Sequence, residues 1–334
     1  RLAALMCVPP LLWAGNAVVG RLVVGLIPPL AFNALRWTIA MALLLPLGWR
    51  VLATGQARAV LRRRWLYLTG LGLSGVASFN ALQYVALTTT TAVNATLITA
   101  GGPVWMMLLG TAFYGERPLP RQWAGSLLSI AGVAVVIGRG DPGALARVQF
   151  VRGDLLMLAA SLIWAVYSWW LARPPASMRA PLRPAWNWAE FLLAQMLFGI
   201  GWSWLWVGGA QAVGSAAPIQ WSGPTLAALL YVAIGPSIVA YWCWGTGVVR
   251  AGPTLAAFFA NLSPLFAALL SALLVGEAPR AYHGLAFALI FLAPILLVAA
   301  FGLVDRAWRS RGFVLAWVAA AVGGLCINPN FYLH

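Results

Sequence analysis

Lysine is absent from this sequence, and acidic residues are nearly as rare: 21 arginines stand against six Asp and Glu in 334 residues. Charged residues make up only 8% of the chain, whereas hydrophobic residues make up 62%. A soluble protein of this length could not cover its surface with so few charges, so the composition predicts an integral membrane protein. The net charge of +15 is scattered over connectors and forms no basic stripe. This pattern favours cytoplasmic loops and argues against a nucleic-acid partner.

Cysteine and histidine are too scarce to predict a disulfide framework or a metal site. Cys7, Cys243 and Cys326 lie in apolar runs without CxxC spacing, and the two histidines are His283 and His334. All six acids fall at the ends of apolar runs or in connectors. This placement argues against a proton relay through a buried carboxylate and against a membrane aspartyl protease. We therefore expect no metal, no cofactor and no enzymatic activity.

Long apolar runs fill most of the chain. Runs of about 20 residues match a hydrocarbon core ~30 Å thick, and none alternates as barrel strands do. The sequence therefore predicts an all-α polytopic membrane protein with ten transmembrane helices. The expected spans are 2–20, 28–49, 65–87, 91–114, 120–138, 154–172, 187–208, 224–248, 253–275 and 281–304. A further apolar run at 312–327 is short for a span, and its placement at the interface, partly across the membrane or as foreign sequence stays open.

The arginines of the connectors predict the orientation. Fourteen of them fall on the side that is cytoplasmic if the N-terminus is inside, and five fall on the other side. Positive charge accumulates in cytoplasmic loops, so we expect a cytoplasmic N-terminus in a multi-pass protein of the bacterial inner membrane. The first apolar run lacks an A-x-A-like exit and is interpreted as a span, not as a cleaved signal peptide. We also expect further residues upstream of Arg1.

The second half of the sequence repeats the first at a distance of 161 positions. The matched pairs are Pro103 with Pro264, Gly115 with Gly276, Glu116 with Glu277, and Pro118 with Pro279. Each half would hold five spans, and an odd number inserts the two halves upside down relative to each other. We expect an inverted repeat of residues 1–139 and 153–304, followed by a tail at 305–334.

Three stretches carry a family resemblance: ALRWTIA at 34–40, GPVWMMLLGTAFYGERP at 102–118 and SPLFAALLSALLVGEAP at 263–279. Together with two sets of five spans, they resemble the drug/metabolite transporter superfamily, and within it the EamA branch of bacterial exporters. The resemblance covers residues 5–304. The abundance of tryptophan and the stretch LLWAGN at 11–16 are similar to aromatic amino-acid exporters of the YddG type. The resemblance implies a ten-helix exporter of small metabolites, and residues 305–334 depart from the usual end of this family.

Polar and aromatic side chains recur at helical spacing on several expected spans. Asparagine in lipid needs hydrogen-bond partners, so it faces either a neighbouring helix or a watery cavity. Both interpretations stay open for each asparagine alone, whereas recurrence at comparable depth favours a shared cavity with aromatic walls for flat or apolar substrates. The expected substrate-binding residues are Trp13, Asn16, Asn80, Tyr84, Asn94, Trp164, Tyr167, Tyr241, Trp244 and Asn261.

Four residues are candidates for gates or hinges. Arg36 lies inside the second span, where it can anchor a substrate carboxylate or pair with Glu277 of the other half. By symmetry, Glu116 would then face the seventh span. Pro103 and Pro264 each remove a backbone donor at mid-depth, which predicts either bend points for alternating access or static kinks.

The favoured function is export of small metabolites, with aromatic or neutral amino acids as the expected substrates, by a monomeric carrier that alternates access around a central cavity. Alternatives are export of lipophilic cations or drugs, or of nucleotide sugars, which would need more basic cavity residues than Arg36. A membrane enzyme or receptor is least favoured because catalytic groups and a sensor domain are lacking. Gly70, Gly72 and Gly75 spell the dinucleotide fingerprint GxGxxG, but no strand precedes them, so we interpret them as helix-packing contacts.

Overall fold

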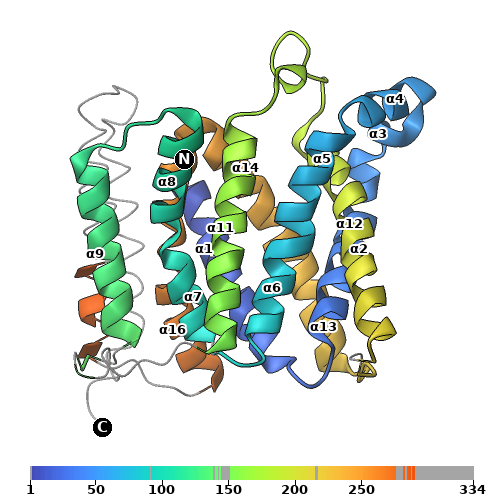
Figure 1. Ribbon diagram of the computed structural model, residues 1–334. Helices are drawn as coiled ribbons and strands as arrows, with labels where there is room; N and C mark the ends of the chain where they lie inside the picture. The colour runs from blue at the N-terminus through green and yellow to red at the C-terminus, as the bar shows by residue number, and fades with distance from the viewer. Residues whose placement is uncertain are drawn as a thin grey trace.

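The computed structural model describes residues 2–90, 92–137, 140–141, 143, 151–214 and 217–275, with short pieces at 281–282, 284–286 and 288–289. Within these residues every regular element is helical (Figure 1). The stretches Leu2–Leu22, Pro29–Gly48, Arg152–Ala172, Trp188–Ala212 and Gly223–Ala251 are each long and apolar enough to cross a membrane. The all-helical class is therefore confirmed for the described part of the chain.

The first nine expected spans each fall on helix. The first half contains α1 (Leu2–Leu22), α2 (Pro29–Gly48), α3 (Arg50–Ala53), α4 (Gly55–Arg63), α5 (Trp65–Leu71), η1 (Gly72–Ser78), α6 (Phe79–Ala86), α7 (Ala92–Ala100), α8 (Gly102–Tyr114) and α9 (Pro120–Ile137). The second half contains α11 (Arg152–Ala172), η2 (Ala176–Met178), α12 (Trp188–Ala212), α13 (Gly223–Val232), η3 (Ala233–Val239), α14 (Ala240–Ala251), α15 (Pro253–Ala260) and α16 (Ser263–Val275). The tenth expected span falls mostly outside the described residues, and the tail at 305–334 falls wholly outside them.

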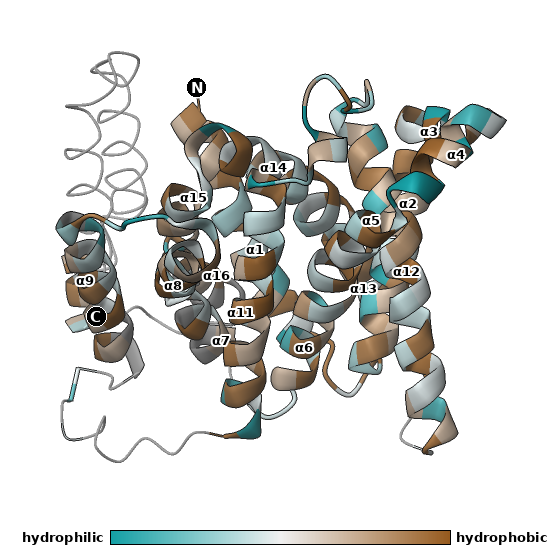
Figure 2. Cartoon of the chain, turned by 45° about the horizontal axis from the view of Figure 1, so that its top comes forward, coloured by the Kyte–Doolittle hydropathy of each residue, from teal (hydrophilic) through white to brown (hydrophobic). Residues whose placement is uncertain are grey.

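The first helices of the two halves run in opposite directions. In Figure 1, α1 descends from the N-terminus at the top, whereas α11 climbs to the connector at 173–187. The connectors at 49–64, 114–120 and 173–187 all lie at the top, and we call this the arginine-rich end. Its hydrophilic colouring on α3 and α4 is visible in Figure 2. The arginines there are Arg50, Arg58, Arg62, Arg63, Arg64, Arg117, Arg173, Arg179 and Arg183, with Arg250 at the nearby end of α14.

Two of the apolar helical stretches each contain a π-helix. The π-helix η1 joins α5 to α6, and η3 joins α13 to α14. The two begin 161 positions apart, which is the same distance that separates the paired proline and Gly-Glu motifs. Pro236 lies inside η3 and lacks the N–H that a regular α-helical turn would use. A π-turn rearranges the hydrogen-bond ladder and is frequent at functional sites.

Two further spans are broken into pairs of helices. The break between α7 and α8 falls at Gly101, and the break between α15 and α16 falls at Asn261 and Leu262. Pro103 and Pro264 therefore occupy the second position of a new helix, where a missing N–H removes no intrahelical hydrogen bond. This differs from the expected kinks within continuous helices. Each proline begins a helix instead, and a hinge at either break stays a prediction.

Glycine allows the helices of the two halves to approach closely. A Cβ atom on Gly72 would lie 2.6 Å from the backbone nitrogen of Gly199 in α12. A Cβ atom on Gly75 would lie 2.6 Å from the Tyr167 ring, and one on Gly70 would lie 2.3 Å from a tryptophan ring. The interpretation of GxGxxG as a packing surface is confirmed, because each glycine accommodates a neighbour where any side chain would collide.

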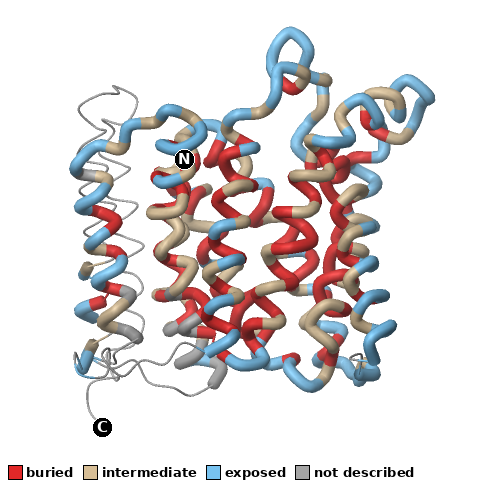
Figure 3. Tube along the Cα trace, in the orientation of Figure 1, coloured by how far each residue is buried: buried red, intermediate tan, exposed pale blue. Residues whose placement is uncertain are grey.

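The core lies in the middle of the bundle. Buried residues, drawn red in Figure 3, concentrate on α1, α2, α6, α11 and α12, whereas α9 carries a mixture of exposed, intermediate and buried residues. Large apolar side chains also cover the outer surface, with Leu47 58% exposed, Leu205 60% exposed and Val249 62% exposed. An apolar exterior around a polar centre is what a bundle in lipid requires.

Candidate functional site

Arg36 of α2 is fully buried and is surrounded by neutral oxygen atoms. Its Nε donates to the Ser237 hydroxyl of η3 at 2.8 Å. Its Nη1 donates to Asn16 Oδ1 at 3.1 Å, to Asn80 Oδ1 at 2.8 Å and to the Tyr84 hydroxyl at 2.5 Å. Its Nη2 has no hydrogen-bond partner among the described residues. The guanidinium therefore joins α1, α2, α6 and η3 without a counter-charge from the described part of the chain.

Aromatic faces and a second layer of hydrogen bonds surround this cation. Arg36 Cζ lies 5.1 Å from the Trp37 ring centroid and 5.7 Å from that of Tyr84. The Tyr84 hydroxyl donates to Asn16 Oδ1 at 2.5 Å, and Asn16 Nδ2 donates to Gln83 Oε1 at 2.9 Å. Cation–π contacts and charge-assisted hydrogen bonds offset part of the several kcal/mol that burial of a charge costs. We call Arg36, Asn16, Asn80, Gln83, Tyr84 and Ser237 the Arg36 network.

Residues that lie 161 positions apart in the sequence meet at the centre. Asn80 and Tyr241 are 161 positions apart, and Asn80 Nδ2 donates to the Tyr241 hydroxyl at 3.3 Å. The Tyr241 hydroxyl in turn donates to the Gly75 carbonyl of η1. Trp13 Nε1 donates to the Pro236 carbonyl of η3 at 3.3 Å. Gly75 and Pro236 are also 161 positions apart, so each π-helix offers a carbonyl to an aromatic side chain of the other half.

Five predicted site residues form one group of tilted and edge-on rings, which we call the aromatic cluster: Trp13, Trp164, Tyr167, Tyr241 and Trp244. Trp164 is at its centre, with ring centroids 5.1 Å from Trp13, 4.9 Å from Tyr167, 5.4 Å from Tyr241 and 5.5 Å from Trp244. Such tilted and edge-on geometries are those that aromatic rings prefer. The cluster joins α1, α11 and α14 at mid-depth of the bundle.

A small cavity lies on one side of the aromatic cluster, and we call it the central cavity. Its volume is about 50 Å³. It is lined by Trp13, Phe79, Gln83, Thr96, Thr99, Gly102, Ser161, Trp164, Ala260 and Ser263. Drug-sized ligands occupy pockets of roughly 300–1,000 Å³, so the central cavity is too small for a metabolite in this conformation.

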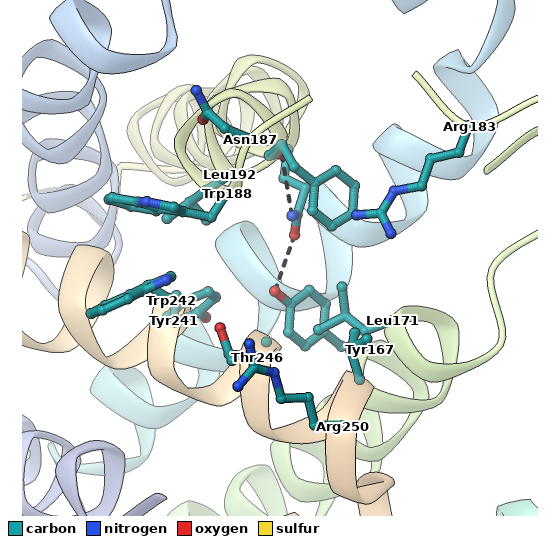
Figure 4. Close-up of a pocket in the computed structure, with 14 residues that line it drawn as sticks. Tyr167, Leu171, Arg183, Asn187, Trp188, Leu192, Tyr241, Trp242, Thr246 and Arg250 are labelled. Atoms are coloured by element: carbon teal, nitrogen blue, oxygen red, sulfur yellow. Dashed lines mark hydrogen bonds between the residues drawn. The ribbon is translucent and has the colours of Figure 1, made fainter. Parts of the chain in front are cut away.

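A larger cavity lies on the other side, toward the arginine-rich end, and we call it the arginine-end cavity (Figure 4). Its volume is about 240 Å³. It is lined by Tyr167, Leu171, Arg183, Asn187, Trp188, Phe191, Leu192, Gln195, Tyr241, Trp242, Gly245, Thr246, Val249 and Arg250. The Tyr167 hydroxyl donates to Gln195 Oε1 at 3.0 Å across it. Tyr167 and Tyr241 line this cavity whereas Trp13 and Trp164 line the central one, so the aromatic cluster separates the two.

Some predicted site residues lie away from both cavities or outside the described residues. Asn261 is buried, but its Nδ2 donates to Ser129 Oγ of α9 at 2.5 Å, and it lines neither cavity. The side chain of Asn94 and the whole of Glu277 lie outside the described residues. The expected pairing of Arg36 with Glu277 therefore stays a prediction, beside the neutral partners that Arg36 has here.

The expectation that Glu116 faces the seventh span is wrong. Glu116 forms an ion pair with Arg173 at the end of α11, and both side chains are well exposed. The physical reason is the end of α8: Gly115 adopts the left-handed conformation at φ 65°, and the chain turns out of the helix before Glu116. The carboxylate consequently reaches a neighbouring helix end at the surface instead of the interior of the bundle.

Sequence reasoning missed several residues of the site. Gln83 lies three positions after Asn80, so helical spacing could have indicated it. Ser237 gave no such signal, because the π-helix shifts the face on which it lies. Arg183 and Arg250 were counted only as charges that set orientation. Among the residues that the structure describes, no group of three or more His, Cys, Asp and Glu side chains could hold a metal.

Comparison with known proteins agrees with this architecture. Residues 2–138 and 151–299 match the EamA-like transporter family. A transporter of Archaeoglobus fulgidus, uncharacterized in function, is 29% identical over 296 residues, which cover 89% of this chain and 96% of that protein. The aromatic amino acid exporter YddG of Ancylobacter novellus is 29% identical over 267 residues, which cover 80% and 86%.

More distant matches follow the same pattern. A probable terminal-alkyne amino-acid exporter of Streptantibioticus cattleyicolor is 26% identical over 215 residues, covering 62% of this chain and 64% of that one. One crystal structure shares the fold with a TM-score of 0.66 at 24% identity, over 92% of this chain and 99% of that one. The resemblance expected from the paired Gly-Glu blocks is confirmed. The protein is a multi-pass membrane transporter and not an enzyme, and the chain belongs to the EamA-like transporter family.

Proposed function

We propose that this protein is a monomeric exporter of small metabolites, with aromatic or neutral amino acids as its substrates. It would contain ten transmembrane helices in two inverted repeats, at 1–139 and 153–304, with 305–334 as a tail. Its N-terminus and its arginine-rich end would face the cytoplasm across a bacterial inner membrane. The equivalent π-helices, the equivalent broken helices and the opposite directions of α1 and α11 support the inverted repeat.

Unequal packing of the two halves supports alternating access. Tyr84 and Gly245 are 161 positions apart. The Tyr84 ring packs 4.7 Å from that of Phe32, and a Cβ atom on Gly20 would lie 2.9 Å from it. At Gly245 a Cβ atom would meet nothing within 4 Å, and the space beside it is the arginine-end cavity. A carrier that is open toward one face is hollow on that side and filled at the equivalent place on the other.

The position of the aromatic cluster between the two cavities is the observation that carries this proposal. A solute that crosses the bundle would have to pass these rings, and flat apolar solutes gain most from contact with them. The names of two relatives, an aromatic amino acid exporter and a probable terminal-alkyne amino-acid exporter, agree with that chemistry. The arginine-end cavity, at about 240 Å³, suits one amino acid better than a nucleotide sugar. Lipophilic cations fit less well, because Arg183 and Arg250 line the same cavity.

Counterflow in proteoliposomes tests the proposal. Labelled phenylalanine outside should enter when phenylalanine or tryptophan is loaded inside, and not when the vesicles are empty. Trp164→Ala should abolish this uptake because it removes the central ring of the aromatic cluster. Trp123→Ala is the matched control, because this tryptophan is 39% exposed on α9 and lines neither cavity. Absence of counterflow with every amino acid, in well-folded wild-type protein, would remove the amino-acid assignment.

A further inference from the structure

Two arginines at the arginine-end cavity are unexplained by the fold. Arg183 belongs to the connector before α12, and Arg250 lies in the last turn of α14. Both are exposed and line the cavity, and Figure 4 shows their side chains reaching toward it from different segments. Within the described part of the chain, neither guanidinium forms a hydrogen bond or an ion pair. Each cation is therefore free to bind an anion.

The connector that carries Arg183 is fixed in place. Arg64 donates through Nε and Nη2 to the Ser177 carbonyl, at 3.2 and 3.0 Å, and through Nη2 to the Leu182 carbonyl at 2.8 Å. These bonds anchor both ends of the segment just before Arg183 to the beginning of α5. Because this connector is already held in place, Arg183 loses less conformational entropy when it binds a ligand than it would on a free loop. This lower cost favours ligand binding at the cavity.

The positive charge at the cavity is not neutralised by its lining. Of the residues that the structure describes, no acidic one lines the cavity. Glu190, in the first turn of α12, is buried, and its carboxylate accepts the backbone N–H of Asn187 at 2.8 Å as part of a capping box. That carboxylate stabilises the start of the helix. A ligand that brings its own anionic group would therefore complement the cavity.

The other residues that line the arginine-end cavity indicate which uncharged groups the ligand carries. Trp188 and Trp242 lie with ring centroids 5.5 Å apart, and Phe191 adds another aromatic wall. The Tyr167 hydroxyl and the Thr246 hydroxyl offer polar contacts at the floor. We propose that the arginine-end cavity is a binding site for a small aromatic carboxylate, whose anionic oxygens Arg183 and Arg250 hold while its ring packs on the aromatic walls. The idea that a solute occupies this site before it reaches the central cavity rests on the proposed transport function. The proposal that the site binds an aromatic carboxylate does not.

Ligand chemistry provides the first test, on purified wild-type protein in detergent without added anionic lipid. Isothermal calorimetry would compare 3-phenylpropionate, phenylalanine and phenethylamine, which share a ring and differ in charge. We expect the two carboxylates to bind and the amine not to bind. Affinity should fall as salt rises from 0.1 to 1 M, because the arginines are exposed and screened. Equal binding of the amine would overturn the site.

Matched variants provide the second test. R183Q and R250Q should each weaken binding of 3-phenylpropionate about tenfold, since each removes one charge-assisted contact. R117Q is the control, because it removes the same charge from the same end of the bundle but does not line the cavity. Both lining arginines are exposed, so these variants should fold, and an unchanged thermal midpoint would verify this. If R117Q weakens binding of 3-phenylpropionate equally, the general positive potential of this end of the bundle attracts the anion, and the site is overturned.

A phospholipid headgroup carries the same anionic chemistry, and nanodiscs distinguish it. If 3-phenylpropionate binds equally well to wild-type, R183Q and R250Q protein in neutral nanodiscs, while phosphatidylglycerol binds to the wild type and not to these variants, the arginines hold lipid and the solute site is overturned. Counterflow separates this proposal from the transport function. Normal binding with no counterflow would refute the function alone. Normal counterflow, with binding that neither R183Q nor R250Q changes, would refute the site alone.

Discussion

Gly245→Leu should leave the protein folded but block the arginine-end cavity. Gly245 lies within α14, and a Cβ atom there meets nothing within 4 Å. Replacing glycine inside a helix removes a cost of about 0.8–1 kcal/mol. A leucine side chain that packs against apolar walls adds up to ~1.5–3 kcal/mol when fully buried. We therefore expect stability to rise by about 1–3 kcal/mol, while the new side chain occupies part of an opening of about 240 Å³.

The assay pairs a thermal-unfolding midpoint with counterflow of labelled phenylalanine. Gly201→Leu is the control, because this exposed glycine of α12 also has nothing within 4 Å of its Cβ position but lines neither cavity. The control should transport normally. Gly245→Leu should keep or raise the midpoint and lose at least nine-tenths of the counterflow. Counterflow by Gly245→Leu at the wild-type rate would show that the solute does not pass through this cavity. A lower thermal-unfolding midpoint would show that no open space lies beside Gly245.

Two further predictions concern the packing of the two halves, and a third concerns the partner of Arg36. Gly72→Ala should lower stability by about 1–3 kcal/mol in thermal unfolding, because its Cβ would meet backbone atoms of α12, whereas Gly208→Ala, which meets nothing, should not. Tyr241→Phe should cost about 1–3 kcal/mol by leaving a buried carbonyl and a buried amide without their partner, yet keep the ring contacts and hence substrate binding. For the pairing predicted from the sequence, a double-mutant cycle of Arg36→Met and Glu277→Gln should give a coupling of about 1–3 kcal/mol; additive effects would leave Arg36 with neutral partners only.

The apolar helices could be predicted because they depend on local properties. A run of about 20 apolar residues favours a membrane-spanning helix whatever lies beside it. The polar faces of Asn16 and Asn80 could be predicted for the same reason, since asparagine in lipid needs a partner. The inverted repeat, based on the 161-position offset in the sequence, stays a prediction.

The identity of those partners could not be predicted, because it depends on long-range packing. Arg36 and Ser237 meet across 201 positions, and the serine lies within the π-helix η3, whose spacing differs from the α-helical spacing assumed for the sequence. Asn261 resembles the cavity asparagines in sequence, but its helix ends at that residue and its amide turns to α9. The position of Arg183 at a cavity could not be predicted, because the sequence does not distinguish a connector arginine that only sets orientation from one that lines a cavity.

The unlike polar contacts of α2 and α12 have a kinetic consequence. Arg36 of α2 forms four hydrogen bonds with α1, α6 and η3, whereas Gln195 of α12 accepts one from the Tyr167 hydroxyl and donates one to the Phe191 carbonyl of its own helix. If different contacts close the carrier on its two sides, the two closed conformations differ in free energy. Each 1.4 kcal/mol of difference changes the ratio of their populations in the empty carrier tenfold. Such a bias cannot move solute against its gradient, but it makes half-saturation differ between the two faces of the membrane. The empty carrier would then be found mostly with its arginine-end cavity open to the solution on that side of the membrane.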